Sequence, residues 1–190
     1  MGSQVMTIQL IPLDSRQVEA YLPQIVSIYR DAFSPPPYNK QESEVAEFAQ
    51  SLPHHMTRDA FRFFGAIQDG TGQMAGFAYG YSSLPGQWWY EHVSQALALQ
   101  TATEWLQDCF QFAEIAVSPP FQGQGTGGRL HDLLLAGIRH DKAVLSTLQA
   151  ETAAFGLYRS RGWVPLLENL FFPGVGRRYQ ILGLKLPTLH

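Results

Sequence analysis

Hydrophobic positions recur along the chain at two spacings, which predict a mixture of strands and helices. Apolar residues three and four apart predict helices over 24–33, 40–51, 127–140 and 152–161, and residues 94–107 are compatible with a helix. Short apolar runs predict strands over 7–13, 61–67, 73–81, 112–117, 143–148, 163–167 and 179–186. Residues 69–72, Asp-Gly-Thr-Gly, join two of these runs as a hairpin turn. The pattern therefore predicts an α/β or α+β domain without internal repeats.

Length and composition place these elements in one soluble domain. The 190 residues suit a single domain, and 45% hydrophobic residues supply a sizeable core. No apolar run reaches the length of a membrane span, and the first residues lack a basic stretch followed by an apolar one. The single cysteine excludes an intrachain disulfide and a zinc site of four thiolates. We therefore expect a cytoplasmic protein that does not bind a membrane.

Charge is unevenly distributed along the chain. The net charge of −3 argues against general nucleic-acid binding. Residues 1–121 carry a net charge of −7, whereas residues 122–190 carry a net charge of +4. This asymmetry predicts an anionic ligand on one side and a cationic one on the other. The alternative is chance clustering of surface charge.

A glycine-rich loop offers the clearest chemical signal. Residues 112–130 predict a strand, a turn at Pro119-Pro120, a loop with four glycines between 123 and 128, and a helix. Glycines let successive backbone N–H groups converge, and a helix start adds unpaired donors and the positive end of its dipole. The loop therefore predicts a phosphate or pyrophosphate cradle. The alternative is a connection chosen only for tight packing.

The ligand of this loop has two interpretations. Gly123-x-Gly125-x-x-Gly128 matches the dinucleotide fingerprint, with Glu151 as a candidate ribose-binding acid. However, only about sixty residues follow the loop, too few for the paired halves of that fold. Gln122-x-x-Gly125-x-Gly127 is a second match over the same residues.

A second motif lies at the right distance after the loop. Residues 154–163, Ala-Phe-Gly-Leu-Tyr-Arg-Ser-Arg-Gly-Trp, place a tyrosine at 158. Loop, tyrosine helix and element order together resemble the GCN5-related N-acetyltransferase (GNAT) superfamily over nearly the whole chain. Two features depart from that family: Glu151 replaces a common asparagine, and residues 84–110 form an aromatic-rich insertion between the third and fourth strands.

The resemblance implies a fold and a cofactor. The fold would be a twisted, mixed, mostly antiparallel sheet of about seven strands, flanked by helices and splayed between strands 4 and 5. The co-substrate would be acetyl-CoA, its pyrophosphate on the loop amides and its pantetheine arm along the fourth strand. The cofactor-binding residues would be Ile115, Ala116, Val117, Gln122, Gly123, Gln124, Gly125, Thr126, Gly127 and Tyr158.

Two residues are candidate catalytic groups. By the resemblance, Tyr158 would protonate the departing CoA sulfur; the alternative is a core tyrosine bound to a carbonyl. Glu114 lies in an apolar strand, where a raised pKa would suit it to take a proton from the amine. The alternative for Glu114 is a structural hydrogen-bond network.

The remaining candidates concern the acceptor and metals. Trp88, Trp89 and Tyr90 of the insertion are predicted to wall an acceptor pocket, with a satellite hydrophobic cluster or a homodimer contact as alternatives. The histidines have no zinc-binding spacing, since His54 and His55 are adjacent and His131 and His140 lie nine apart. We therefore expect no metal.

The sequence thus predicts one GNAT-like domain over 1–190. It would transfer acetyl from acetyl-CoA to a primary amine of a small molecule or peptide, by direct attack in a ternary complex. A non-catalytic module that binds and senses acyl-CoA is the first alternative. A dinucleotide-binding oxidoreductase is the second.

Overall fold

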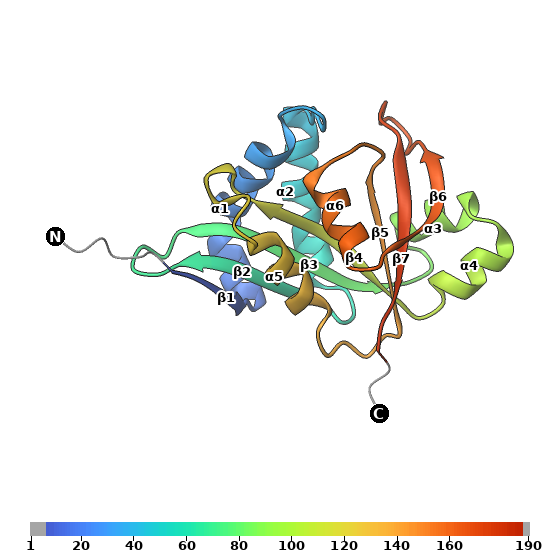
Figure 1. Ribbon diagram of the computed structural model, residues 1–190, viewed down its shortest axis with the longest axis horizontal. Coiled ribbons are helices and arrows are strands. Elements are labelled where there is room, and N and C mark those ends of the chain that lie inside the picture. The colour runs from blue at the N-terminus through green and yellow to red at the C-terminus, as the bar shows by residue number, and fades with distance from the viewer. Residues whose placement is uncertain (1–6, 188–190) are drawn as a thin grey trace. The chain divides into compact units, whose positions relative to one another are not determined.

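Seven strands and six α-helices make up the part of the chain that the computed structural model describes, residues 7–187 (Figure 1). The strands are β1 (Ile8–Pro12), β2 (Arg62–Gln68), β3 (Met74–Ser83), β4 (Cys109–Val117), β5 (Lys142–Leu148), β6 (Val164–Leu170) and β7 (Tyr179–Lys185). The helices are α1 (Ser15–Phe33), α2 (Glu42–Met56), α3 (Trp88–Ala96), α4 (Leu99–Leu106), α5 (Thr126–Leu135) and α6 (Ala153–Ser160), with a short 3-10 helix η1 (Pro119–Phe121).

The strands form one sheet in the order β1-β2-β3-β4-β5-β7-β6. The β1–β2, β2–β3, β5–β7 and β6–β7 pairs are antiparallel, whereas β4 and β5 are parallel. The β4–β5 register consists of Phe110 opposite Ala143 and Gln111 opposite Val144. Phe112, next along β4, has no β5 partner in that register. The predicted fold class, a mixed sheet of seven strands flanked by helices, is confirmed.

Contacts divide the chain into two units, and β3 and β4 have residues in both. The first unit comprises Met1–Gly80 and Glu114–Ala136, described from residue 7. The second comprises Tyr81–Ala113 and Gly137–His190, described to residue 187. Each unit has its own hydrophobic core.

Stacked aromatic rings form the core of the first unit. Tyr29 of α1 stacks on Phe48 of α2, with ring centroids 3.9 Å apart and planes 3° apart. Phe48 in turn lies 6.1 Å from Phe77 of β3, a strand whose ten residues are all buried. Phe63 of β2 completes the stack, 5.6 Å from Phe77. Rings at helical spacing on α1 and α2 thus meet rings at alternate positions of the strands.

Helix α1 starts nine residues earlier than the predicted 24–33 helix. Asp14 and Gln17 form a capping box: the Asp14 carboxylate accepts from the Gln17 backbone N–H at 2.9 Å, and the Gln17 side chain accepts from the Asp14 N–H at 2.9 Å. This cap stabilises the first turn by about 1 kcal/mol. The helix then continues through Pro23, which cannot donate a backbone hydrogen bond.

Helix α5 is shorter than the predicted 127–140 helix. Gly137 has a φ of 68°, a left-handed conformation that ends helices. Arg62 of β2 also donates to the backbone carbonyl of Ala136 at 2.8 Å, which satisfies a group at the helix end. The continued apolar pattern to Ile138 therefore does not extend the helix.

The insertion folds as two helices, not the single 94–107 helix of the sequence pattern. Helices α3 and α4 are separated at Leu97-Ala98, which adopt extended angles. The buried members of their cluster with the second unit's strands are Trp89, Val93, Leu97, Trp105, Leu106, Cys109, Val144, Phe172 and Ile181. This cluster is the core of the second unit.

We expect Gly76→Ala to lower the free energy of unfolding by about 1–3 kcal/mol. A Cβ on Gly76 of β3 would lie 2.8 Å from the Ala116 carbonyl oxygen of β4. Because that oxygen belongs to the backbone of a paired strand, it cannot move away without a cost in free energy. Urea unfolding measures the change. Gly156→Ala is the control, because its Cβ meets nothing within 4 Å and a helical alanine is favoured by about 1 kcal/mol. A Gly76→Ala protein as stable as the parent would contradict the close approach.

Candidate functional site

The loop between β4 and α5 presents open backbone donors. Gly123 and Gly125 have φ of 73° and 79°, and a Cβ at either would meet nothing within 4 Å. Gly125 is the N-cap of α5 and makes no side-chain capping bond. The first N–H groups of a helix lack intrahelical acceptors, and the dipole there is positive. The loop therefore has the geometry of an anion cradle.

Two glutamine side chains hold the loop in shape. The Gln122 side-chain amide donates to the Val117 carbonyl at 2.8 Å, and the Gln124 amide donates to the Pro120 carbonyl at 3.2 Å. Both side-chain amides therefore make hydrogen bonds to the backbone of the loop and the strand end. Thr126 is only 2% exposed. The Gln122 backbone N–H is also used, because it donates to the Pro119 carbonyl at 3.2 Å. The loop therefore offers a ligand the backbone N–H groups that follow Gln122.

The end of β4 leads directly into this loop. Ala116 is buried, whereas Ile115 and Val117 are half-buried. The Ser118 N–H donates to the Ala75 carbonyl of β3 at 2.8 Å, which ties the strand end to its neighbour. The predicted pantetheine-binding strand and the predicted pyrophosphate cradle therefore belong to the same unit.

Glu114 lies on β4, two residues before Ala116. Burial raises the pKa of its carboxyl from 4.5 to about 7, against the opposing effects of the Lys40 charge and the Ile115 backbone N–H. A carboxyl with this pKa exchanges protons near neutral pH, as a general base must. The expected rise in pKa agrees with the structure in direction and in cause.

The first unit also holds a partly buried histidine–tyrosine pair. The His55 Nδ1 lies 3.0 Å from the hydroxyl of Tyr79, a β3 residue that is 2% exposed. Desolvation, with Arg58 and His54 as smaller causes, lowers the pKa of His55 to about 4. The imidazole is therefore neutral near pH 7 and acts as a hydrogen-bonding partner of Tyr79.

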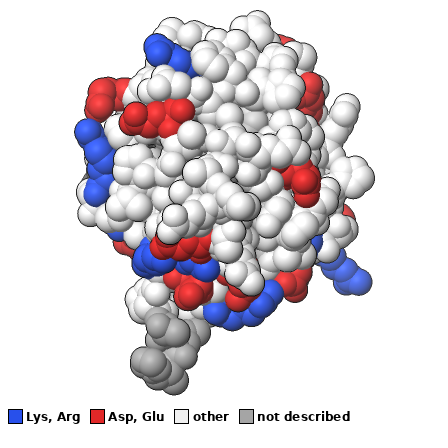
Figure 2. Space-filling model, turned by 90° about the vertical axis from the view of Figure 1, so that its right-hand side faces the viewer, with Lys and Arg blue, Asp and Glu red and all other residues white. Residues whose placement is uncertain are grey.

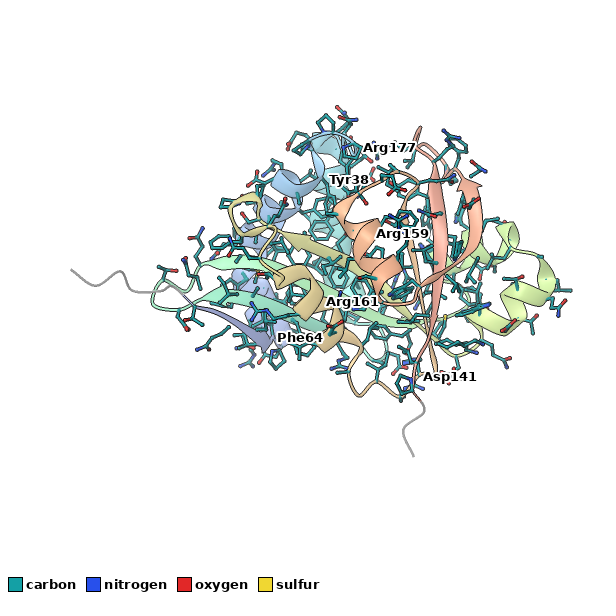
Figure 3. The ribbon with its side chains drawn as sticks, viewed as in Figure 1. Tyr38, Phe64, Asp141, Arg159, Arg161 and Arg177 are labelled. Atoms are coloured by element: carbon teal, nitrogen blue, oxygen red, sulfur yellow. The ribbon has the colours of Figure 1, made fainter. Side chains whose placement is uncertain are left out.

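Tyr158 belongs to the second unit, near the end of α6. Its ring packs edge-on against Phe112 (centroids 6.1 Å apart) and Trp163 (5.8 Å), and it is 5% exposed. Arg159, the next residue on α6 (Figure 3), donates to the Glu151 carboxylate at 2.9 Å. The carboxylate at the position of the family's asparagine therefore binds α6.

The aromatic residues of the insertion have different environments. Trp89 is 8% exposed, and its indole N–H donates to the Ser146 hydroxyl at 3.1 Å. Tyr90 packs against the second unit's core. Trp88 is 54% exposed and lies beside His92, with centroids 4.2 Å apart. Trp89 thus has a structural role, and Trp88 is the member of the predicted pocket wall with a largely accessible ring.

The structure brings the predicted residues together in two groups. Glu114, the β4 backbone and the glycine loop lie in the first unit. Tyr158, Trp88, Trp89 and Tyr90 lie in the second.

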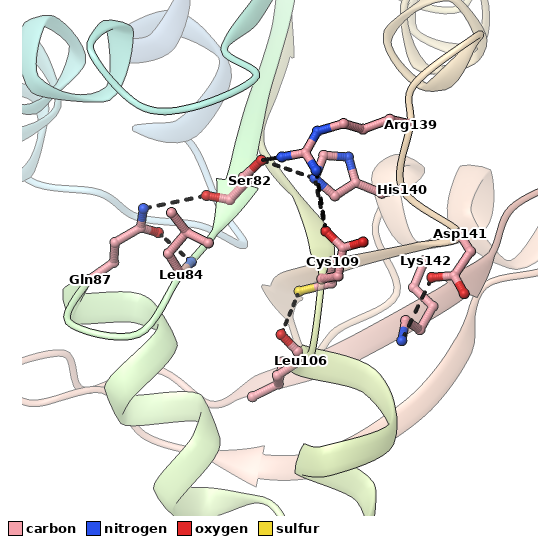
Figure 4. A network of polar contacts seen from close by, with 10 residues as sticks. Ser82, Leu84, Gln87, Leu106, Cys109, Arg139, His140, Asp141 and Lys142 are labelled. Carbon is pink, nitrogen blue, oxygen red and sulfur yellow. Dashed lines mark hydrogen bonds and ion pairs between the residues drawn. The ribbon is translucent and has the colours of Figure 1, made fainter.

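A polar network that the sequence did not indicate lies in the second unit (Figure 4). The Ser82 hydroxyl lies 2.9 Å from the Nε2 of His140, and Arg139 donates to the same hydroxyl at 3.3 Å. Asp108 approaches this same Nε2 at 3.9 Å, so it does not orient the ring through the other nitrogen as a catalytic triad requires. Ser82 is 1% exposed and His140 2%. The network therefore links β3 to the segment before β5.

Charge, metal and membrane features complete the description of the surface. On the face in Figure 2, blue and red side chains are scattered over a mostly uncharged surface. Within residues 7–187, no three His, Cys, Asp or Glu side chains group so as to hold a metal ion. No helix of that range is long and apolar enough to cross a membrane.

Comparisons with known proteins agree on one family. The profile described as "Acetyltransferase (GNAT) family" matches residues 22–163. A GCN5-like protein acetyltransferase of Mycobacterium tuberculosis is 36% identical over 124 residues, which are 60% of this chain. The match spans 59% of that relative's length.

Solved structures share the fold at low identity. The ribosomal-protein-S18-alanine N-acetyltransferase of Escherichia coli aligns with a TM-score of 0.62 and 20% identity, over 97% of each chain. A chain of the NatC complex bound to Gag peptide and CoA aligns with a TM-score of 0.64 and 16% identity, over 96% of this chain and 100% of that one.

We expect Glu114→Gln to be more stable than the parent above neutral pH. The carboxyl titrates at about 7 in the folded chain against an ordinary 4.5, so its ionisation opposes folding between these values. The variant's advantage in Tm should be constant below about pH 4.5, grow as the pH rises through about 7, and then level off. Thermal unfolding across pH measures it, with the exposed Glu47→Gln as a control for charge loss. A difference independent of pH would contradict the raised pKa.

Proposed function

The chain belongs to the acetyltransferase (GNAT) family, and from this premise we propose that it transfers acetyl from acetyl-CoA to a primary amine of a small molecule or peptide. The observation that carries the proposal is the first unit's combination of an open cradle and a carboxyl that titrates near neutrality on the strand leading into it. The amine attacks the thioester directly, within a ternary complex. The matched residues 22–163 include parts of both units, so we propose a single functional domain.

The cradle's fit to CoA rests on the open space beside two of its glycines. The space at Gly123 and Gly125 is what a pyrophosphate needs to approach the N–H groups of residues 123–127, whereas the Gln122 N–H donates to the Pro119 carbonyl at 3.2 Å. The β4 backbone at residues 115–117 binds the pantetheine amides, as a neighbouring strand would. When bound, acetyl-CoA supplies an acetyl group activated as a thioester. The NatC structure with CoA supports this assignment, because its chain has the same fold.

Glu114 is the proposed base. An attacking ammonium must lose a proton, and a carboxyl with a pKa of about 7 is partly ionised at neutral pH and able to accept it. Its position immediately before residues 115–117 supports this role, because the thioester would follow the pantetheine arm along the same strand.

Tyr158 is the proposed acid. Its hydroxyl donates a proton to the CoA sulfur as the C–S bond breaks. Edge-on packing against Phe112 and Trp163 holds the ring in one orientation, as a positioned proton donor requires. Finding a tyrosine here favours an enzyme over a module that only binds acyl-CoA, since binding does not require this hydroxyl.

The acceptor is an amine whose identity the relatives leave open. The names of the M. tuberculosis relative and the E. coli enzyme indicate protein acceptors for those proteins. For this chain we propose an amine on a small molecule or a peptide, with Trp88 against its apolar part. We also propose that the protein is cytoplasmic and that it forms a homodimer through the insertion.

We expect acetyl-CoA to raise the Tm of the parent and to release free CoA when a suitable amine is present. At a hundredfold its Kd, the ligand adds about 2.7 kcal/mol of stability. Gly125→Val should lose most of both effects, because a β-branched residue fills the cradle and resists a φ of 79°. Thermal shift and a thiol assay over a panel of amines measure them.

The matched control is Gly70→Val in the β2–β3 turn. Gly70 also has a φ of 79° and open space around its Cβ, so it tests backbone strain alone. Equal binding by Gly125→Val and the parent would show the loop assignment to be wrong. A Tm rise without CoA release from any amine would favour the sensing module.

We expect Tyr158→Phe to lower kcat by about a hundredfold or less, because a CoA thiolate is already a fair leaving group. The KM for acetyl-CoA and the Tm should change little, since the ring stays packed. Steady-state kinetics on the best amine measure the effect, and Tyr179→Phe controls for loss of a hydroxyl in the same unit. A large rise in KM with kcat intact would make Tyr158 a binding residue.

A further inference from the structure

The side chain of Arg62, the first residue of β2, binds the C-terminal end of helix α5. Its Nη1 donates to the Ala136 carbonyl at 2.8 Å, and its Nη2 donates to the Leu133 carbonyl at 3.4 Å. Leu133 lies in the last turn of the helix, and Ala136 is its C-cap. The last carbonyls of a helix lack intrahelical donors and lie at the negative end of its dipole. A guanidinium therefore stabilises this end both by hydrogen bonding and by charge.

The position of this guanidinium is fixed by its own strand. Arg62 is paired with Gly80 of β3 in the antiparallel register. The guanidinium carbon lies 5.3 Å from the centre of the Phe64 ring, which comes two residues later on the same face of β2 (Figure 3). Burial lowers the pKa of Arg62, because part of its side chain is removed from water. A cation in that position needs polar partners, and the two helix carbonyls supply them.

The opposite end of α5 is the glycine loop. Gly125 is the N-cap, and its carbonyl accepts the Arg129 N–H at 3.1 Å as the helix begins. This end packs closely on β4, since a Cβ on Gly127 would lie 3.8 Å from the Val117 Cγ2. Ten residues make the helix about 15 Å long. Contacts with β4 at one end and with β2 at the other therefore fix its direction over the sheet (Figure 1).

The direction of α5 determines where its first N–H groups point. These groups lie along the helix axis and would face a phosphate bound at the loop. If the C-terminal end moved, the helix would tilt and the donors at its start would turn away from that phosphate. The charge of Arg62 has a second effect, because it offsets the negative end of the dipole and leaves the positive end at the loop less opposed. Both effects reach the cradle through the helix.

We propose that Arg62 is a positioning residue for the pyrophosphate of the acyl donor, and that it acts from the far end of α5. The inference rests on the proposed function, which places that pyrophosphate on the loop amides. Arg62 takes no part in acetyl transfer itself. It sets the affinity of the cradle for a ligand that carries phosphate groups, so a comparison of ligands with and without phosphate tests its role.

The variant Arg62→Met removes the charge and both donors but keeps an unbranched apolar stem. We expect its Kd for CoA to be about three- to tenfold above that of the parent, which is the scale of a partly buried charge at a helix end. Pantetheine has the same thiol arm without any phosphate, so its Kd should not change. Titration calorimetry measures the first constant, and competition against CoA measures the second.

Two further variants separate the position of the charge from its presence. Arg62→Lys keeps the charge but lacks the planar fork that reaches both carbonyls, so it should recover part of the lost affinity. Arg30→Met is the matched control, because Arg30 belongs to the same unit and pairs with Glu42 at 2.9 Å. It should bind CoA as the parent does. A loss of affinity in Arg30→Met equal to that in Arg62→Met would attribute the effect to net charge and overturn the inference.

Hydrogen exchange of the α5 amides tests the link through the helix. In Arg62→Met we expect faster exchange in the last turn, together with the weaker CoA binding. Faster exchange with unchanged CoA binding would show that Arg62 only stabilises the helix end, and an equal loss of affinity for pantetheine would show a general loss of structure. Either result would overturn the inference. If Arg62→Met does not fold, Arg62→Gln, which keeps an N–H donor without the charge, replaces it under the same criteria.

The inference and the proposed function fail in different ways. A parent protein that does not bind CoA would reject the cradle, and the role of Arg62 with it. If the parent binds CoA and Arg62→Met binds it equally well, the role of Arg62 is rejected and the proposed function stands.

Discussion

The close approach of β3 to β4 at Gly76 determines where the candidate site begins. With hydrogen as its side chain, Gly76 lets the Ala116 carbonyl oxygen lie within 2.8 Å of where a Cβ would stand. The adjacent Ala75 carbonyl accepts the Ser118 N–H, immediately before the two prolines that end the strand. The path of β4 is thereby fixed on one side, and both Glu114 and the glycine loop take their positions from it. If β3 and β4 were less closely packed, the position of the Glu114 carboxyl relative to the glycine loop would not be fixed.

Much of the fold could be predicted because most elements carry a recognisable hydrophobic pattern in their own sequence. Period-two and period-3.6 patterns place every strand within three residues, whereas α6 is the one helix placed that closely at both ends in the part of the chain that the structure describes. The errors lie where a nonlocal or backbone effect overrides the pattern. The start of α1 depends on a capping box before Pro23. The end of α5 depends on a left-handed Gly137 and on Arg62, which is distant in sequence. Helices α3 and α4 are separated where Leu97 and Ala98 turn extended.

Those features of the candidate site that lie within one continuous stretch of sequence could be predicted. The glycine loop is contiguous, so its donors could be placed from sequence alone. The raised pKa of Glu114 also followed from its apolar neighbours along the strand. The effect of Lys40 on that pKa could not be found this way, because the 34–39 turn must first bring the Lys40 backbone back to the end of α1, where its N–H donates to the Phe33 carbonyl. Trp89 shows that an aromatic pattern leaves the side chain's partner open, since its indole N–H donates to Ser146 on a strand distant in sequence.

The environment of the sole cysteine has a consequence for the chemistry of thiols around this protein. Cys109 is fully buried, and desolvation raises its pKa to about 12. The thiolate is the reactive form, so at neutral pH this sulfur neither attacks disulfides nor reacts readily with alkylating agents. Each turnover of the proposed reaction would release a free thiol into solution. The protein can therefore work amid an accumulating thiol, or its oxidised disulfide, without becoming covalently joined to its own product.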